Sequence, residues 1–157
     1  PEAPADRGAT AQEDCDLDTE SGRVLSVAAP RLHTLPTRYD GPDLADVAAM
    51  LHLPAAEVVR RHRAATWTVA AVGFSPGFGY LTTPDPLFAA VGRLADPRPR
   101  VPRGSVALAA RMCAVYPSAT PGGWQLIGST TAEMFDVAAE HAALLRFGDR
   151  VEFVEVP

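Results

Sequence analysis

The sequence predicts a mainly β protein, a β-barrel or sandwich with a short helical pair packed on one side. From Thr66 onward, short segments that alternate in polarity or are continuously apolar are separated by glycine and proline turns. Residues 73–130 hold 8 of the 12 glycines and 8 of the 15 prolines, so tight turns are concentrated there. At 157 residues and 47% hydrophobic composition, the chain has enough apolar surface for one domain.

The first 23 residues differ in composition from the rest of the chain. They carry seven acidic residues, two arginines and almost no large apolar side chains. Such a segment buries too little surface to offset the entropy of ordering it. We expect residues 1–23 to be a disordered tail or the remnant of an N-terminal domain, and residues 24–157 to form the barrel domain. Because the sequence starts at Pro1 without a methionine, we expect a trimmed or incomplete N-terminus.

Two helices are predicted over about residues 43–65. Leu44, Val47, Ala48 and Leu51 follow the spacing of an amphipathic helix, with Asp43 as the expected N-cap. This helix should end near residue 53, because a proline follows it. That proline can open a second helix over residues 55–65.

Extended segments account for most of the remainder. Residues 24–28 form a candidate strand, and Pro36 limits the segment 33–39 to a sheet edge. Further strands are expected at 66–74, 105–110, 113–117, 124–130 and 150–156. In the last of these, Val151, Phe153 and Glu155 alternate with Glu152, Val154 and Val156, which is the period of a strand. Residues 132–145 form either a helix or an irregular loop followed by a helix.

Composition excludes several functional classes. The net charge is −5 and there is no lysine, so we expect no nucleic-acid partner, no Schiff base and no phosphate-loop lysine. Without an apolar stretch of about 20 residues or a secretory signal, we expect no membrane association and a soluble, cytoplasmic protein. Two cysteines and four isolated histidines predict neither a disulfide framework nor a metal site.

Residues 73–77 match the G-x-S-x-G pattern of a hydrolase nucleophile elbow. We reject this match because Pro76 has no backbone N–H for an oxyanion, and the sequence that follows cannot start a helix. A structural turn is the preferred interpretation. By itself, His62 is more typical of a packing histidine than of a catalyst.

Arginines 98, 100 and 103 alternate with prolines that stiffen the backbone. Such a strip suits recognition of a carboxylate or phosphate, but it is equally typical of a solvated loop that pairs with surface acids. Aromatic side chains gather nearby and could either wall a pocket or fill the barrel: Phe78, Tyr80, Tyr116 and Trp124.

Several motifs in fixed order resemble a known family. They are GFSPGFGYL (73–81), PRPRVPRGSVALA (97–109), VYP (115–117), PGGWQLIG (121–128) and GDRVEFVEV (148–156). This order resembles the C-terminal domain of the family that includes the B subunit of 5-oxoprolinase, the kinase inhibitor KipI and allophanate hydrolase subunit 1. The resemblance covers residues 33–156 and implies a closed cyclophilin-like β-barrel.

The resemblance also implies a function and a site. It implies a non-autonomous hydrolase subunit of an ATP-dependent 5-oxoprolinase, which opens 5-oxoproline to L-glutamate together with a companion of carboxyltransferase type (the C subunit of 5-oxoprolinase, or a KipA-like protein). ATP would be a co-substrate of the complex, and no metal is expected. The implied catalytic residues are His62, Tyr80, Arg98 and Ser105. The implied residues that bind the amide or carboxylate substrate are Phe74, Pro76, Gly77, Phe78, Arg100, Tyr116, Pro121, Gly122, Gly123 and Trp124.

Two departures from the family pattern leave alternatives open. Where members of the family have a QTG motif, this chain has Met112, Cys113 and Ala114, and Ser129 replaces an arginine. The loss of these polar groups favours a KipI-like module that inhibits a sensor histidine kinase. The retained arginines and PGGW favour a small-molecule cleft. A protein of allophanate hydrolase or urea amidolyase type is a further alternative, and prolyl isomerase activity rests on barrel analogy alone.

Overall fold

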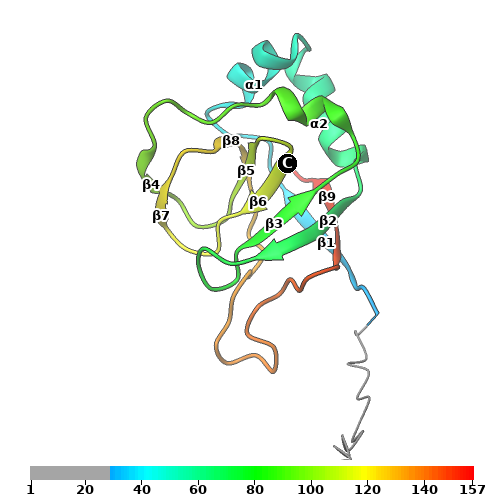
Figure 1. The fold of residues 1–157 in the computed structure, drawn as a ribbon, viewed down its shortest axis with the longest axis vertical. Coiled ribbons are helices and arrows are strands. Elements are labelled where there is room, and N and C mark those ends of the chain that lie inside the picture. Colours follow the sequence, from blue (N-terminus) through cyan, green and yellow to red (C-terminus); the bar gives the residue numbers. More distant parts are fainter. Residues whose placement is uncertain (1–28) are drawn as a thin grey trace, which may run out of the picture.

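A computed structural model describes residues 29–157, so the predicted acidic tail and the candidate strand at 24–28 lie outside the described residues. Two helices lie on one side of a strongly curved β-structure (Figure 1). The elements in chain order are β1 (Leu32–Thr37), α1 (Leu44–Leu51), α2 (Ala55–Ala64), β2 (Trp67–Val72), β3 (Gly79–Thr82), the 3-10 helix η1 (Pro86–Ala90), β4 (Arg98–Val101), β5 (Ser105–Ala109), β6 (Met112–Val115), β7 (Thr120–Gly122), β8 (Gln125–Ser129) and β9 (Arg150–Glu155).

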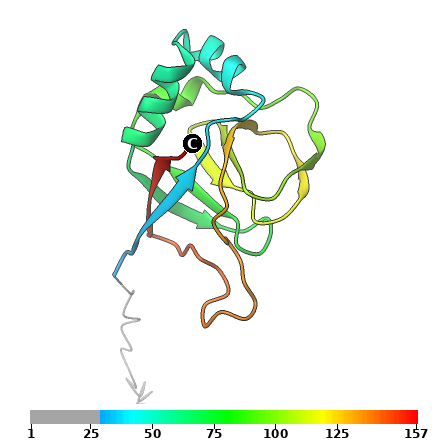
Figure 2. The ribbon, with the colours of Figure 1, turned by 180° about the vertical axis from the view of Figure 1, so that it is seen from behind.

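Seven strands form one sheet in the order β1-β9-β2-β3-β6-β5-β8, and β4 pairs with β7 in a second small sheet. The strands β1 and β9 run parallel and side by side, as the view from behind shows (Figure 2). Pro36 lies on the terminal strand β1, so its predicted edge position is confirmed. The alternation predicted for the last strand is present in β9, where Val151 and Phe153 are buried and Glu152 and Val154 are exposed.

The two ends of the seven-stranded sheet meet just after β1. Arg38 and Ser129 exchange two backbone hydrogen bonds of 2.8 Å each, and the N–H groups of Gly41 and Asp43 donate to Ile127 and Leu126 on β8. The sheet is therefore nearly closed into a barrel, which confirms the predicted mainly β barrel with its helical pair.

Both predicted helices are present, but Asp43 does not cap α1 with its side chain. Its carboxylate instead accepts hydrogen bonds from the Leu126 backbone and from Arg98. The helix α1 ends at Leu51, and the next residue, His52, caps it in the left-handed conformation with φ 53°. The helix α2 begins after Pro54, as expected.

The helix predicted within 132–145 is wrong. The structure has no helix there, and the segment leaves the barrel as a long excursion between β8 and β9 (Figure 1). An isolated bridge joins Phe135 to Ala143, and the Asp136 carboxylate accepts the Ala138 backbone N–H in a turn. A short polar side chain that bonds its own backbone in this way competes with helix formation. Buried Met134 and Leu145 anchor the two ends of the excursion.

Three short strands were not predicted: β3, β4 and β7. The segments that contain them are rich in glycine and proline, so the sequence predicts them as turns. They matter for function because β3 and β7 carry residues of the candidate site.

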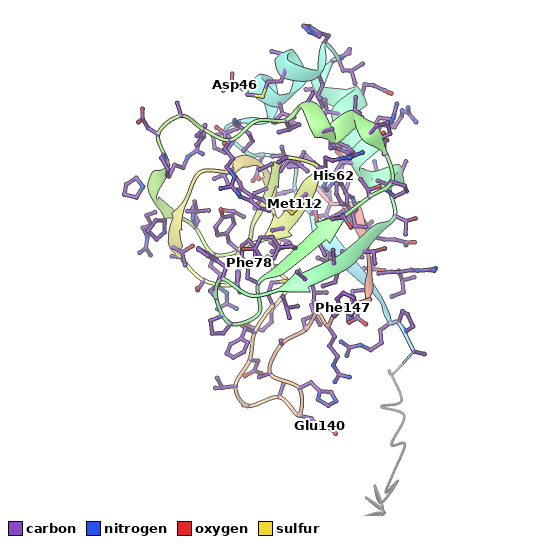
Figure 3. All side chains as sticks on the ribbon, viewed as in Figure 1. Asp46, His62, Phe78, Met112, Glu140 and Phe147 are labelled. Carbon is purple, nitrogen blue, oxygen red and sulfur yellow. The ribbon has the colours of Figure 1, made fainter. Side chains whose placement is uncertain are left out.

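The strand β5 is buried along its whole length and separates two apolar clusters. Val106 and Leu108 belong to a large cluster beneath the helices. Ala107 and Ala109 belong to a smaller cluster rich in aromatic side chains. In Figure 3 the labelled His62 lies on the side of the helices, and Phe78 lies nearer the β2–β3 turn.

Candidate functional site

An aromatic pocket of about 160 Å³ opens beside the smaller cluster. We call it the aromatic pocket throughout. It is lined by Phe74, Phe78, Tyr80, Arg93, Tyr116, Pro121, Gly122, Gly123 and Trp124. Eight of these nine residues were implied by the family resemblance, so the structure brings most of the predicted binding residues together.

Phe78 is the centre of the aromatic wall. It is 3% exposed, and its ring lies 5.0–6.0 Å from the rings of four neighbours, edge-on to each: Phe74, Tyr80, Tyr116 and Trp124. Edge-to-face contacts at such distances are favourable. The wall rests on alanines 107, 109 and 114, whose small side chains leave room for the rings. The sequence thus specifies a rigid wall with small residues behind it.

The turn between β2 and β3 holds Phe74 and Phe78 in place. Phe78 N–H donates to Ser75 O over 3.0 Å, and Gly73 N–H donates to Phe78 O over 3.1 Å. Phe74 is 64% exposed at the pocket rim and has a positive φ of 67°. Such a conformation is uncommon for a bulky residue and marks a locally constrained turn.

Pro76 and Gly77 do not line the pocket, although the resemblance implied both as binding residues. Gly77 has φ +81°, and a Cβ there would meet the Phe135 Cβ at 2.7 Å and the Met134 carbonyl oxygen at 2.8 Å. Its role is to let the turn pack against the 132–145 excursion. The rejected nucleophile elbow is a turn here, and the described structure shows no hydrogen-bond partner for the buried Ser75 Oγ.

The Tyr116 hydroxyl packs against the backbone of β7. A Cβ at Gly122 would lie 2.3 Å from the Tyr116 Oη, so this approach requires glycine. Burial raises the pKa of Tyr116, and the charges of Arg93 and Arg98 partly oppose that shift. Tyr116 therefore stays a neutral phenol at physiological pH, able to donate a hydrogen bond.

Arg98 is held by an internal ion pair and does not line the pocket. Its Nη2 donates to Asp43 Oδ1 over 2.6 Å, while Asp43 Oδ2 accepts the Leu126 N–H over 2.6 Å. The other terminal nitrogen, Nη1, is buried without a partner among residues 29–157. Arg98 thus ties β4 to the start of α1, which accounts for its position without a catalytic role.

Arg100 and Ser105 also lie outside the pocket lining. Arg100 is exposed on β4. The Ser105 hydroxyl donates to the Pro102 carbonyl over 2.8 Å and so closes a turn. Arg103, the third member of the predicted arginine strip, pairs with Glu133 at the surface. The strip therefore does not converge on one ligand.

His62 is fully buried in the larger cluster, away from the aromatic pocket. Its Nδ1 is 2.9 Å from the Tyr39 hydroxyl, and its Nε2 is 3.3 Å from Cys113 Sγ. Burial lowers the pKa of His62 to about 3 and raises the pKa of Cys113, so the pair is neutral. This geometry fits the packing interpretation of His62 and does not place the ring where it could orient a substrate.

Arg93 is the pocket residue that sequence reasoning missed. Its guanidinium carbon is 6.0 Å from the centre of the Trp124 ring, and Arg93 is the only charged residue of the lining. It lies outside the proline-stiffened strip, so the sequence offers no spacing that points to it. Only the folding of the 91–94 segment over β7 reveals it.

No group of three or more His, Cys, Asp or Glu side chains within residues 29–157 could hold a metal ion. Among the same residues, no helix is long and apolar enough to cross a bilayer. The lining of the aromatic pocket offers a single cation, Arg93, for the phosphates of ATP.

Comparison with known proteins gives a consistent picture. The profile of the family described as "Carboxyltransferase domain, subdomain C and D" matches residues 13–145. The B subunit of 5-oxoprolinase from Escherichia coli O157:H7 is 49% identical over 115 residues, which cover 73% of this chain and 52% of that protein. The B subunit of 5-oxoprolinase from Bacillus subtilis is 41% identical over 129 residues, covering 80% and 53% respectively. The chain thus spans about half the length of these relatives.

Solved structures agree on the fold. A conserved uncharacterized protein from Pyrococcus horikoshii superposes with a TM-score of 0.74 at 32% identity, covering 80% of this chain and 59% of that one. The Kluyveromyces lactis urea carboxylase superposes with a TM-score of 0.65 at 21% identity, covering 82% of this chain and 14% of that one. The second likeness concerns the fold alone.

Proposed function

Because the chain belongs to the family of the carboxyltransferase domain, subdomain C and D, we propose that it is a subunit of an ATP-dependent 5-oxoprolinase, which opens 5-oxoproline to L-glutamate. The observation that carries this proposal is the 49% identity to the B subunit of a 5-oxoprolinase over 73% of the chain. The aromatic pocket is the part of this chain that would receive the substrate.

The chemistry of the aromatic pocket suits a small cyclic amide. The apolar side chains of Phe78 and Trp124 suit the carbon skeleton of a five-membered ring, and the phenols of Tyr80 and Tyr116 can donate hydrogen bonds to an amide carbonyl. In the transition state for ring opening, that carbonyl oxygen gains negative charge, which such donors stabilise.

We place the chemical step in a complex rather than in this chain alone. The lining of the aromatic pocket contains no histidine, cysteine or carboxylate to act as nucleophile or general base. Opening an unstrained amide ring breaks its C–N bond, with water supplying OH to the carbonyl carbon and H to the nitrogen. ATP hydrolysis drives this step, and we assign ATP to a companion of carboxyltransferase type, the C subunit of 5-oxoprolinase or a KipA-like protein.

Two further proposals follow from the same family. We place the complex in the cytoplasm, where ATP is available. We also divide the chain as the sequence suggests, into an N-terminal segment, residues 1–23, and a barrel domain, residues 24–157.

A KipI-like inhibitor of a sensor histidine kinase is the second candidate. The observation that favours it is the exposed side chain of Phe74, which stands 64% exposed at the pocket rim beside Val72, itself 56% exposed. Neighbouring exposed apolar groups are typical of a surface that docks a protein.

The test is to express the chain with its companion protein and to measure phosphate release and glutamate formation. We expect both to depend on 5-oxoproline and to require both proteins. Tyr80→Phe should lower kcat/KM about 3- to 10-fold, because it removes one hydrogen-bond donor and keeps the ring. Arg150→Gln is the control, since Arg150 is exposed on β9 and lies outside the pocket lining, and it should leave kcat/KM unchanged.

Lack of 5-oxoproline-dependent turnover by the pair would contradict the proposal. Inhibition of a histidine kinase by the chain alone, lost on Phe74→Ala, would favour the second candidate instead.

A further inference from the structure

We infer that Arg93 is the anion anchor of the aromatic pocket and that the pocket takes a small ring compound bearing a carboxylate, with the carboxylate on Arg93. The inference rests on the proposed function only for the identity of the ring. The position of Arg93 supports the rest of the inference, that the pocket holds a carboxylate.

Arg93 gives the pocket a positive charge in a protein of net charge −5. No acidic residue lines the pocket, and no carboxylate within residues 29–157 lies within 4.0 Å of the Arg93 guanidinium nitrogens. Arg98 and Arg103, by contrast, are each paired with an acid. The guanidinium of Arg93 therefore has donors available for a ligand, and a planar guanidinium matches a carboxylate through two parallel hydrogen bonds.

The backbone on both sides of Arg93 is fixed. Val91 O accepts the Ala110 N–H over 2.8 Å, and Gly92 O accepts the Gln125 side-chain amide over 3.2 Å. On the other side, Leu94 N–H donates to Gly123 O over 2.8 Å, which ties Arg93 to the pocket rim itself. Holding the Cα in place reduces the entropy lost when the side chain binds an anion.

The Trp124 ring supports the guanidinium from one side. Their separation of 6.0 Å is within the range of a cation–π contact. This contact biases the flexible arginine toward the mouth of the pocket, next to the aromatic faces that would hold the ring. The volume of about 160 Å³ is enough for a small ring.

The test uses the two tryptophan indole N–H signals in a ¹H–¹⁵N NMR spectrum of the full chain. The Trp124 indole lines the pocket, whereas the Trp67 indole is buried and donates to His62 O over 3.1 Å. Ligand titration should shift the Trp124 signal and leave the Trp67 signal in place. In each variant, a Trp67 signal at its wild-type position shows that the protein is folded.

The ligands are 5-oxoproline, 2-pyrrolidinone, which is the same ring without the carboxylate, 2-furoate, which is another small ring carboxylate, and inorganic phosphate. Wild-type protein should bind 5-oxoproline at least about tenfold more tightly than 2-pyrrolidinone, as expected for charge-assisted hydrogen bonds. Arg93→Gln should abolish that difference and leave 2-pyrrolidinone binding unchanged. Arg150→Gln, which changes an exposed arginine on β9 outside the pocket lining, should retain the difference.

The inference is overturned if Arg93→Gln retains the preference for the carboxylate, if neither carboxylate shifts the Trp124 signal, or if phosphate binds more tightly than both. Binding of 2-furoate but not 5-oxoproline, lost in Arg93→Gln, would keep the anchor and refute the 5-oxoproline assignment. Binding of 5-oxoproline that is independent of Arg93 would refute the anchor and keep the 5-oxoproline assignment.

Discussion

His62 shows how burial decides the role of a single residue. The ring contacts Trp67, Phe88 and Phe153 and lies against the Tyr39 hydroxyl and the Cys113 thiol. Burial raises the pKa of Tyr39 well above its usual value, and nearby charge on Cys113 would raise it further. Three titratable groups thus share one site as neutral, hydrogen-bonded partners, which is the state that a low-dielectric core favours.

Because burial lowers the pKa of His62 from its usual 6.5 to about 3, folding should oppose its protonation. The unfolded chain takes up this proton below about pH 6.5, so stability is complete above that pH and falls as the pH drops toward 3. The slope is about 1.4 kcal/mol per pH unit for one proton, or on the order of 2 to 3 kcal/mol lost by pH 4.5.

The measurement is the free energy of unfolding from urea titrations between pH 7 and pH 4.5, for wild type and His62→Gln. The variant should be less stable at pH 7, because it loses ring packing, but its pH slope should be smaller by about one proton. His52→Gln, which changes a helix-end histidine in an exposed position, is the control and should keep the slope. Parallel curves for wild type and His62→Gln would show that His62 is not buried as a neutral ring.

At the scale of elements, a cluster around Asp149 joins the start of β1 to the start of β9. The Asp149 carboxylate accepts the Arg31 backbone N–H, the Arg31 guanidinium, His33 Nε2 and the Arg146 N–H. Burial raises the pKa of Asp149, but the hydrogen bonds from Arg31, His33 and Arg146 outweigh it and hold the pKa well below its usual range. The only parallel strand pair of the described sheet is thus fastened at one end by one carboxylate.

A carboxylate with a depressed pKa adds stability above its unfolded pKa, near pH 4, and that stability is lost as the pH falls further. We expect Asp149→Asn to cost about 2 kcal/mol at pH 7, a value reduced by the 38% exposure of the Arg31 side chain. Below pH 4 the wild type should approach the variant. Urea unfolding at pH 7 and pH 3 measures the difference in the free energy of unfolding between wild type and variant at each pH. Asp46→Asn, in the first turn of α1, is the control. A difference as large at pH 3 as at pH 7 would contradict the assignment.

The elements also show what sequence can predict. Periodicity identified the two helices and the strands of the main sheet other than β3, because alternation and i, i+3, i+4 spacing directly reflect which face is buried. Periodicity did not identify β3, β4 and β7, whose segments are rich in glycine and proline. At Gly122 on β7, for example, the close approach of Tyr116 requires a glycine. Periodicity also failed at 132–145, where an excursion anchored by Met134 and Leu145 has a composition compatible with helix.

In the candidate site, too, the sequence named some residues and missed another. The family resemblance named the aromatic residues that the structure brings together in the pocket, whereas the residues alone left open whether they wall a pocket or fill the barrel. The sequence named Arg98 and not Arg93, because what separates them is a partner distant in sequence: Asp43 pairs with Arg98, and no acid within residues 29–157 pairs with Arg93. Pairing of charges across the fold has no local signature.

On the scale of the whole molecule, the barrel depends on the seam where the start of α1 meets β8. Gly128 lies in this seam, and a Cβ there would be 2.3 Å from the Arg38 carbonyl oxygen. That oxygen accepts the Ser129 N–H, one of the two backbone hydrogen bonds that close the sheet. Gly41 faces the same restriction from the other side, with its Cβ position 2.3 Å from the Ile127 carbonyl carbon. Two glycines thus allow the sheet ends to touch.

Gly128→Ala should therefore push the seam apart and lower the free energy of unfolding by about 2 to 4 kcal/mol, the range of forced overpacking and lost hydrogen bonds. Gly73→Ala is the matched control, because a Cβ at Gly73 meets nothing within 4 Å and the residue has no positive φ, so its effect should stay within about 1 kcal/mol. Amide hydrogen exchange localises the change: Arg38 and Ser129 should exchange faster in Gly128→Ala, while Val106 and Leu108 on β5 should lose only the protection that follows from lower global stability. Equal stability of the two alanine variants would mean that the barrel does not rely on this seam, and that the aromatic pocket is held in place by β5 and β6 alone.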